Sequence, residues 1–201
     1  MTLMRQSFQI KGIVPIILHN GRMANPLDPW AKKLKEVSGK RKKVDADYEQ
    51  MAKIEWFASL YLDKSDRIIL PGMMLEASLV NGAKKFKLGQ QAKAGLFVES
   101  HAILQFDGQE LSPEQLWERG ENTLTVACKV SMAKIMRTRF IAYEWAADVA
   151  VTFDDGLFNP AQISEIFEAS GMQIGVGTWR PRHGRFFAEP MGKPEVLKIA
   201  A

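Results

Sequence analysis

Residues 174–187 concentrate side chains that could bind a polyanion. Glycine lets a backbone approach a ligand or bend sharply, arginine presents a planar fork suited to phosphate, and tryptophan offers a face on which a base can stack. The stretch follows a helix-like run and precedes an apolar pair, so we expect a helix-to-strand connection that binds nucleic acid. The alternative is a glycine-rich turn with solvated arginines. The candidate contacts are Gly175, Gly177, Trp179, Arg180, Arg182, His183 and Arg185.

The histidines could supply acid–base chemistry. His19 ends an expected strand just before Asn20 and Gly21, where it could act as a general base on a ribose hydroxyl. A base needs a positioned partner, and the sequence shows none, so a structural histidine bonded to a loop carbonyl is the simpler interpretation. His101 lies in an apolar strand. Three scattered histidines and one cysteine form no metal motif, so we expect neither a metal nor a cofactor.

Cations are distributed unevenly along the chain. The 201 residues, enough for one domain, carry a net charge of +4. The windows 31–43, 84–93, 129–139 and 180–185 hold 18 of the 27 Lys and Arg residues and one acidic residue. Such segregation indicates a polyanion partner, although the windows could also be separate solvated faces. The candidate contacts outside 174–187 are Lys40, Arg41, Lys42, Lys43, Lys84, Lys85, Lys129, Lys134, Arg137 and Arg139.

Targeting and membrane signals are not evident in the sequence. No apolar run approaches the roughly 20 residues that span a bilayer. Residues 1–9 lack the apolar core of a signal peptide. We therefore expect a cytoplasmic protein without membrane association.

The first part of the chain predicts one strand followed by a helical insertion. Residues 8–19 alternate as a strand does, and Pro15 indicates an edge position or a bulge. Asp28 suits an N-cap and Pro29 the first helical position, so we expect a helix over 29–37 and a second over 46–61. The insertion then spans about 20–65, with a basic loop between its helices.

The remaining pattern predicts alternating strands and helices. We expect a polar loop at 89–93, a helix opened by Ser112, and a frayed tail after residue 190. The domain would thus cover 1–190 and the tail 191–201. Expected strands are 67–70, 96–106, 124–130, 135–153 and 185–189, and the other expected helices are 73–85 and a capped helix from Asn159 to Gly171.

The fold class that this order predicts is α+β. Without the insertion the order is βαββαβ, the ferredoxin-like (RRM-like) arrangement. Three stretches resemble the RAMP superfamily, the RNA-binding subunits of CRISPR effector complexes. Residues 8–19 are similar to its first strand, residues 67–85 to its strand–Pro-Gly–helix element, and residues 174–187 to its C-terminal glycine-rich loop. The loop departs from the usual pattern by having fewer glycines and more aromatic character.

The resemblance implies roles for particular residues. It implies that the glycine-rich loop contacts RNA or DNA, and that the 129–139 hairpin clamps the strand as a thumb through its lysines and arginines. Some RAMP subunits cut RNA with an aspartate after the first strand, a region that includes Asp28, although helix capping explains Asp28 completely. A phage or mobile-element origin is compatible with such a gene.

Three functions remain open from the sequence. The first is a non-catalytic protein that binds single-stranded RNA or DNA, as a homo-oligomer along the strand or as a subunit of a nucleoprotein complex. The second is a metal-independent endoribonuclease that uses His19. The third is a protein-binding module or inhibitor that imitates a RAMP subunit.

Overall fold

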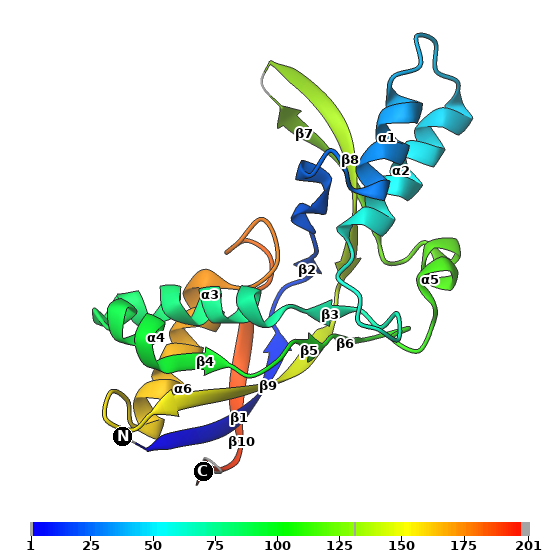
Figure 1. Ribbon diagram of the computed structural model, residues 1–201. Helices are drawn as coiled ribbons and strands as arrows, with labels where there is room; N and C mark the ends of the chain where they lie inside the picture. Colours follow the sequence, from blue (N-terminus) through cyan, green and yellow to red (C-terminus); the bar gives the residue numbers. More distant parts are fainter. Residues whose placement is uncertain (1, 131, 198–201) are drawn as a thin grey trace.

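A five-stranded antiparallel sheet forms the base of the molecule (Figure 1). The computed structural model describes residues 2–130 and 132–197. Along the sheet lie β10 (Phe186–Val196), β1 (Leu3–Gly12), β9 (Trp145–Asp154) and β4 (Leu96–Val98), and the short β6 (Gln105–Phe106) pairs with the start of β9. The protein is therefore of the mixed α+β class, with antiparallel sheets.

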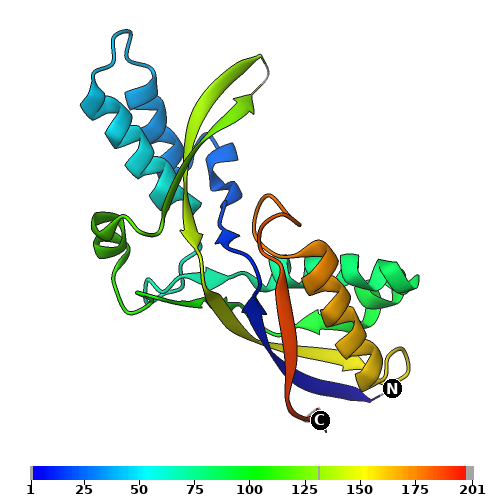
Figure 2. The same cartoon turned by 180° about the vertical axis from the view of Figure 1, so that it is seen from behind.

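Two helices cover one face of this sheet and close the core. Helix α3 (Gly72–Ala83) packs on β4, α6 (Pro160–Ala169) packs on β10, and the two helices touch each other. Figure 2 shows α6 running beside β10. Period-two alternation turns Phe8 and Ile10 of β1 into this core, where both are fully buried. The ring of Phe8 stacks on Phe167 of α6 at a centroid distance of 3.9 Å.

The helical insertion forms where the capping signals predict it. After the turn η1 (Gly21–Ala24), α1 (Pro29–Ser38) and α2 (Asp45–Ser59) form an antiparallel pair joined by the basic loop. Asp28 accepts a 2.8 Å hydrogen bond from the Trp30 amide, as an N-cap does. Helix α2 packs on β8 and buries Trp56, whose indole NH donates to the Asn122 carbonyl at 2.9 Å.

A β-hairpin rises beside the insertion in Figure 1. It consists of β7 (Thr123–Val130) and β8 (Ala133–Ala142), and β2 (Ile16–Ile17) pairs with the lower end of β8. The expectation of one strand over 135–153 is wrong, because the chain breaks at Tyr143 and Glu144 and β8 and β9 join different sheets.

The expected first strand over 8–19 is also divided into two, β1 and β2. Gly12 leaves no room for a Cβ against the indole of Trp145. That indole donates to the Val14 carbonyl at 2.9 Å, and the Ile13 amide turns to the Arg185 carbonyl at 2.8 Å. Pro15 lies within this break. The first strand therefore contributes to both sheets.

Several shorter elements differ from the expectation. Residues 89–93 belong to a helix, α4 (Gly89–Gly95), and not to a polar loop, because Ala92 and Leu96 are buried and hold this segment on the core. The expected strand 96–106 is divided into β4, β5 (Ala102–Ile103) and β6, and β5 pairs with β3 (Ile69–Leu70). Helix α5 (Pro113–Arg119) starts at the Ser112 cap as predicted.

The end of the chain is more ordered than the sequence suggests. Strand β10 continues to Val196 and pairs with β1 through Met191, Glu195 and Val196, so residues 190–196 are not the frayed tail that we expected. Residues 198–201 of the expected tail lie outside the described part of the chain. None of the described helices is long and apolar enough to cross a membrane.

Candidate nucleic-acid interface

Residues 175–185 form what we call the glycine–arginine loop, which is anchored on the first strand region. Helix α6 ends in a π-helical turn, η3 (Ser170–Ile174), from which the loop leaves. The Thr178 amide donates to the Ile17 carbonyl at 2.9 Å, and the Gly184 amide to the Pro15 carbonyl at 2.9 Å. Both ends of the loop are thus fixed to residues 15–17, and its exposed middle is presented from a defined position.

The glycines of this loop are required for its packing. Gly175, Gly177 and Gly184 all have positive φ angles. A Cβ on Gly175 would lie 2.8 Å from the Gly184 carbonyl oxygen, and one on Gly177 would lie 2.6 Å from that of Ile17. This close approach of protein backbone accounts for the glycines. Direct contact of Gly175 and Gly177 with nucleic acid stays a prediction.

Helix α3 supports the loop through small side chains. The Ser78 hydroxyl donates to the Gly175 carbonyl at 2.9 Å, and the Ser170 hydroxyl donates to the Ser78 carbonyl at 3.2 Å. Gly82 faces the same turn and leaves no room for a Cβ against Ser170. The small face of this helix therefore packs on η3 and α6.

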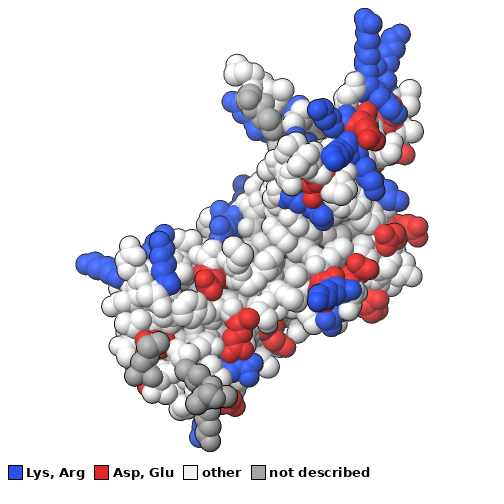
Figure 3. Space-filling model, in the orientation of Figure 1, with Lys and Arg blue, Asp and Glu red and all other residues white. Residues whose placement is uncertain are grey.

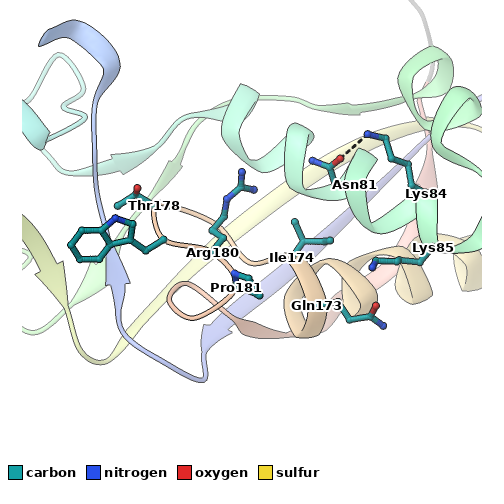
Figure 4. Close-up of a pocket in the computed structure, with 10 residues that line it drawn as sticks. Asn81, Lys84, Lys85, Gln173, Ile174, Thr178, Arg180 and Pro181 are labelled. Carbon is teal, nitrogen blue, oxygen red and sulfur yellow. Dashed lines mark hydrogen bonds between the residues drawn. The ribbon is translucent and has the colours of Figure 1, made fainter. Parts of the chain in front are cut away.

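An open hollow of about 720 Å³ lies between α3 and the loop. Lys84 and Lys85 line it from the turn η2 (Lys84–Phe86), which follows α3, and Arg180 lines it from the loop (Figure 4). The Lys84 ammonium donates to the Asn81 side chain at 2.8 Å, and Arg180 approaches the Gly175 carbonyl at 3.4 Å. Two of the four basic windows thus converge on one cavity. Its other lining residues are Asn81, Gln173, Ile174, Gly177, Thr178, Trp179 and Pro181.

Trp179 offers an aromatic face at the edge of this hollow. Its side chain is 41% exposed, and its φ of +57° is unusual for a bulky residue. The Trp179 carbonyl accepts the His183 amide at 3.2 Å, and the two rings lie 6.1 Å apart. Arg182 is exposed and Arg185 is half-buried. The geometry therefore permits stacking on Trp179 next to the cations of the hollow.

The β7–β8 hairpin carries four candidate cations, of which the two lysines are exposed and the two arginines are ion-paired or half-buried. Lys129 and Lys134 are directly opposite each other near the end of the hairpin, where they are exposed. Arg137 instead forms an ion pair with Glu55 of α2. Arg139 is half-buried, and burial is the largest cause that lowers its pKa. The lysines are consequently the freely accessible part of the predicted thumb.

His19 lies at the foot of this hairpin. It shares a hollow of about 400 Å³ with Arg137, Arg139 and Glu55. His19 is exposed to solvent, but its partial burial lowers the pKa of the imidazole below its ordinary value. Arg139 and Arg137 lower this pKa further, and Glu55 opposes them. The His19 carbonyl accepts the Tyr61 hydroxyl at 3.0 Å. The sequence did not reveal this proximity, since Glu55 and Arg139 are distant from His19 along the chain.

Asp28 is engaged as a helix cap and in an ion pair with Arg22, whose Nε lies 3.0 Å from its carboxylate. Burial acts to raise the pKa of Asp28, but the hydrogen bonds from Arg22 and the Trp30 amide outweigh it, and the pKa lies below its ordinary value. The helix cap and the ion pair explain why an aspartate occupies position 28. A role of Asp28 in RNA cleavage stays a prediction.

The basic loop between α1 and α2 lies at the tip of the insertion. Lys40 pairs with Asp47 at 2.5 Å, and Lys43 donates to the Lys40 carbonyl at 2.9 Å. Arg41 and Lys42 are exposed. Figure 3 shows Lys and Arg side chains projecting from this end of the molecule and from the region of α3 and α4. The four windows thus form two groups, one around the 720 Å³ hollow and one around the insertion and hairpin.

The uncovered face of the large sheet is different in character. Its cations are paired, Arg5 with Glu99 at 2.9 Å and Lys11 with Glu189 at 2.9 Å. Asp148 accepts hydrogen bonds from Gln9 and Gln105, both at 3.2 Å. Because Arg5 and Lys11 are paired with carboxylates and Asp148 adds a further negative charge, this face offers less attraction to a polyanion than the loop and the hairpin.

Comparisons with known proteins reveal similarity at the level of the fold. No protein-family model and no curated protein matches the chain. A chain in the cryo-EM structure of the Type III-B Cmr-beta bound to cognate target RNA is similar, with a TM-score of 0.53 and 10% sequence identity over 98% of the present chain. The present chain spans 61% of that chain. The likeness therefore shows the fold alone.

Proposed function

We propose that this protein binds single-stranded nucleic acid, with RNA as the preferred ligand. The convergence of Lys84, Lys85 and Arg180 on one open hollow beside the exposed Trp179 carries this proposal. Single-strand binders combine cations that track the backbone with an aromatic ring on which a base stacks. The choice of RNA is supported by the Cmr-beta structure, which contains target RNA.

The proposal includes a RAMP-like, ferredoxin-like core. The strand order β10-β1-β9-β4 and the two helices against one face support it. The protein would act in the cytoplasm as a subunit of a nucleoprotein complex or as a homo-oligomer along the strand. Gly175, Gly177, Arg182, His183 and Arg185 would belong to the same interface as the hollow. The hairpin lysines and the basic tip would extend it.

Fluorescence anisotropy with labelled single-stranded RNA, single-stranded DNA and duplex DNA tests the proposal. We expect tight single-strand binding that weakens steeply with salt, because each phosphate contact releases counterions. The double variant Arg180→Ala/Arg182→Ala should weaken it about tenfold or more. The control Lys64→Ala/Lys193→Ala removes the same charge from exposed positions outside the four windows.

Two outcomes would contradict the proposal. An equal loss in the control variant would mean that only net charge matters. No binding to any of the three ligands at moderate salt would exclude nucleic-acid binding by the isolated chain. The protein-binding module that imitates a RAMP subunit would then become the favoured function.

A metal-independent endoribonuclease is the second candidate, and the surroundings of His19 favour it. Its lowered pKa keeps the imidazole neutral near pH 7, as a general base requires, and Arg137 and Arg139 line the same hollow. Incubation of end-labelled RNA with the wild type and with His19→Ala in the presence of a chelator tests this function. Loss of cleavage with binding retained would support it, and absence of cleavage by the wild type would exclude it.

A further inference from the structure

We infer that the hollow between β2, β8 and α2 is a second anion site, in which Arg139 and His19 hold one phosphate group and His19 makes the binding tighter at lower pH. This inference rests on the proposed function and deepens it. The 720 Å³ hollow next to the glycine–arginine loop would be the first site.

The strand pairing brings the two side chains together. Strand β2 pairs with β8 through Ile16 with Ala142 and Ile17 with Ile141. The Leu18 amide continues this ladder to the Phe140 carbonyl at 3.1 Å. One residue further, the same register places His19 opposite Arg139. The pair is thus fixed by backbone hydrogen bonds rather than by flexible loops.

The charges in this hollow do not balance. Two arginines line it, and Glu55 is the only carboxylate among its lining residues. Glu55 is 5% exposed, and it already pairs with Arg137 and accepts the Thr138 amide at 2.9 Å. The Arg139 guanidinium donates to the Thr138 carbonyl at 2.9 Å, and no carboxylate of the described residues pairs with it. Glu55 also attracts Arg139 electrostatically, but one carboxylate shared by two arginines leaves a net positive charge in a partly buried place, which is costly. A bound anion would compensate that charge.

The lining selects a phosphate over a base or a metal ion. The turn η1 and helix α1 contribute only apolar side chains to it, namely Met23, Ala24 and Leu34. None of the described lining residues is Phe, Tyr or Trp, so the imidazole of His19 is the one ring that they contribute. A guanidinium fork matches two oxygens of a phosphate, and the imidazole can donate a further hydrogen bond when protonated. The volume of about 400 Å³ is sufficient for a phosphodiester with part of its sugar.

The imidazole gives the site a defined response to pH. Burial and the two arginines hold the pKa of His19 below 6.5 in the free protein, with Glu55 alone opposing. A bound phosphate would stabilise the imidazolium and raise this pKa. Phosphate binding is then accompanied by proton uptake at His19. The affinity for phosphate therefore increases as the pH falls through the pKa of His19 in the bound protein, and it becomes constant below the pKa of His19 in the free protein.

The site also lies on a continuous path from the first hollow. Ile17 pairs with β8 on one side and accepts the Thr178 amide of the glycine–arginine loop on the other. His19 follows two residues later. A strand that leaves the loop past Thr178 would therefore pass the end of β2 before it reaches the hairpin lysines. Two phosphates of one strand could occupy the two hollows together.

An NMR titration of the full chain tests the site without any nucleic acid. The imidazole signals of His19, His101 and His183 are followed against pH with and without inorganic phosphate, and His19→Gln assigns the first. We expect phosphate to raise the pKa of His19 in the wild type and to leave it unchanged in Arg139→Gln. An unchanged pKa of His19 in the wild type would overturn the inference.

Anisotropy with single-stranded RNA tests the site in its proposed context. Affinity should rise several-fold between about pH 8 and about pH 5.5. This response should be largely lost in His19→Gln and persist in His101→Gln, which changes an exposed histidine outside the proposed interface. Arg139→Gln should weaken binding about tenfold and reduce the logarithmic salt slope by about 0.7. Arg139→Lys should recover part of the affinity, and circular dichroism verifies that each variant is folded.

The outcomes separate this inference from the proposed function. If Arg180→Ala/Arg182→Ala weakens RNA binding but His19→Gln keeps the pH response, the second site is wrong and the proposed function stands. If the wild type binds no strand, the proposed function fails. The phosphate titration then decides the second site alone.

Discussion

At the scale of single residues, Gly184 is the position on which the glycine–arginine loop depends most. It combines a φ of +72° with contact against the Val176 backbone, where a Cβ would clash. We expect Gly184→Ala to lower the free energy of unfolding by about 2 kcal/mol or more. Urea denaturation measures this change. RNA binding should weaken in parallel, because the loop that presents Arg180 and Trp179 would shift.

Gly120 provides the matched control for this prediction. Its φ of +75° is similar, but apart from its chain neighbours no atom of the described residues lies within 4 Å of a Cβ built there. Gly120→Ala should therefore cost only the strain of a left-handed backbone, about 1 kcal/mol. Equal losses in the two variants would mean that φ alone, and not the close approach to Val176, explains Gly184.

His19 should make the stability of the protein depend on pH. Burial is the largest cause that lowers its pKa in the folded state, so the unfolded state binds a proton more readily. The stabilisation that comes from a neutral His19 is fully present above 6.5, the pKa of an unperturbed histidine in the unfolded state. It is lost as the pH falls through the lower pKa that His19 has in the folded state.

The variant His19→Gln isolates this contribution. Urea denaturation of the wild type at about pH 7.5 and about pH 5.5 should show a loss at the lower pH. The variant should lose less over the same interval, since His101 and His183 remain in both proteins. An identical loss of unfolding free energy in the two proteins would contradict the assignment of this pH dependence to His19.

At the scale of elements, the two lysines of the β7–β8 hairpin should destabilise the fold but strengthen RNA binding. Lys129 and Lys134 are opposite each other on neighbouring strands, and like charges in that position are destabilising. Lys134→Glu should therefore stabilise the fold by about 0.5 kcal/mol and weaken RNA binding several-fold. Thermal unfolding and anisotropy measure the two effects. Lys64→Glu is the control for charge alone, and stronger RNA binding by Lys134→Glu would remove the hairpin from the interface.

Capping and alternation were sufficient to predict most elements. Asp28, Ser112 and Asn159 each begin a helix as expected, because their side chains accept amides of the first turn. The break at Tyr143 and Glu144 was not predictable, since the alternation continues from β8 into β9 and does not reveal a change of sheet. Helix α4 is not predictable, because Gly89, Gln90 and Gln91 are typical of a loop and the buried Ala92 and Leu96 hold the segment on the core.

The candidate site was predictable in composition but not in arrangement. The sequence identifies the basic windows, yet nothing in it indicates that Lys84 and Arg180 line one hollow. It also does not reveal that Glu55 engages Arg137, because the two residues are 82 positions apart. These relations arise from the packing of α3 on η3 and of α2 on β8, which are long-range contacts.

At the scale of the whole molecule, two groups of cations lie at different places on the protein. One group surrounds the hollow beside the glycine–arginine loop, and the other extends over the hairpin and the tip of the insertion (Figure 3). A strand that reaches both groups gains avidity over one that reaches only the first. The length of the nucleic acid should therefore decide which residues matter.

We expect an RNA of about 4 nucleotides to use the first group alone and one of about 12 nucleotides to use both, within the range of single-strand site sizes. Lys84→Ala/Lys85→Ala should weaken both RNAs. Lys129→Ala/Lys134→Ala should weaken only the longer RNA and reduce its salt slope by about 1.4, because two phosphate contacts are lost. Anisotropy over a salt series measures these effects, with Lys64→Ala/Lys193→Ala as the charge control. An equal loss for the short RNA in the hairpin variant would mean that the two groups do not act as separate parts of one surface.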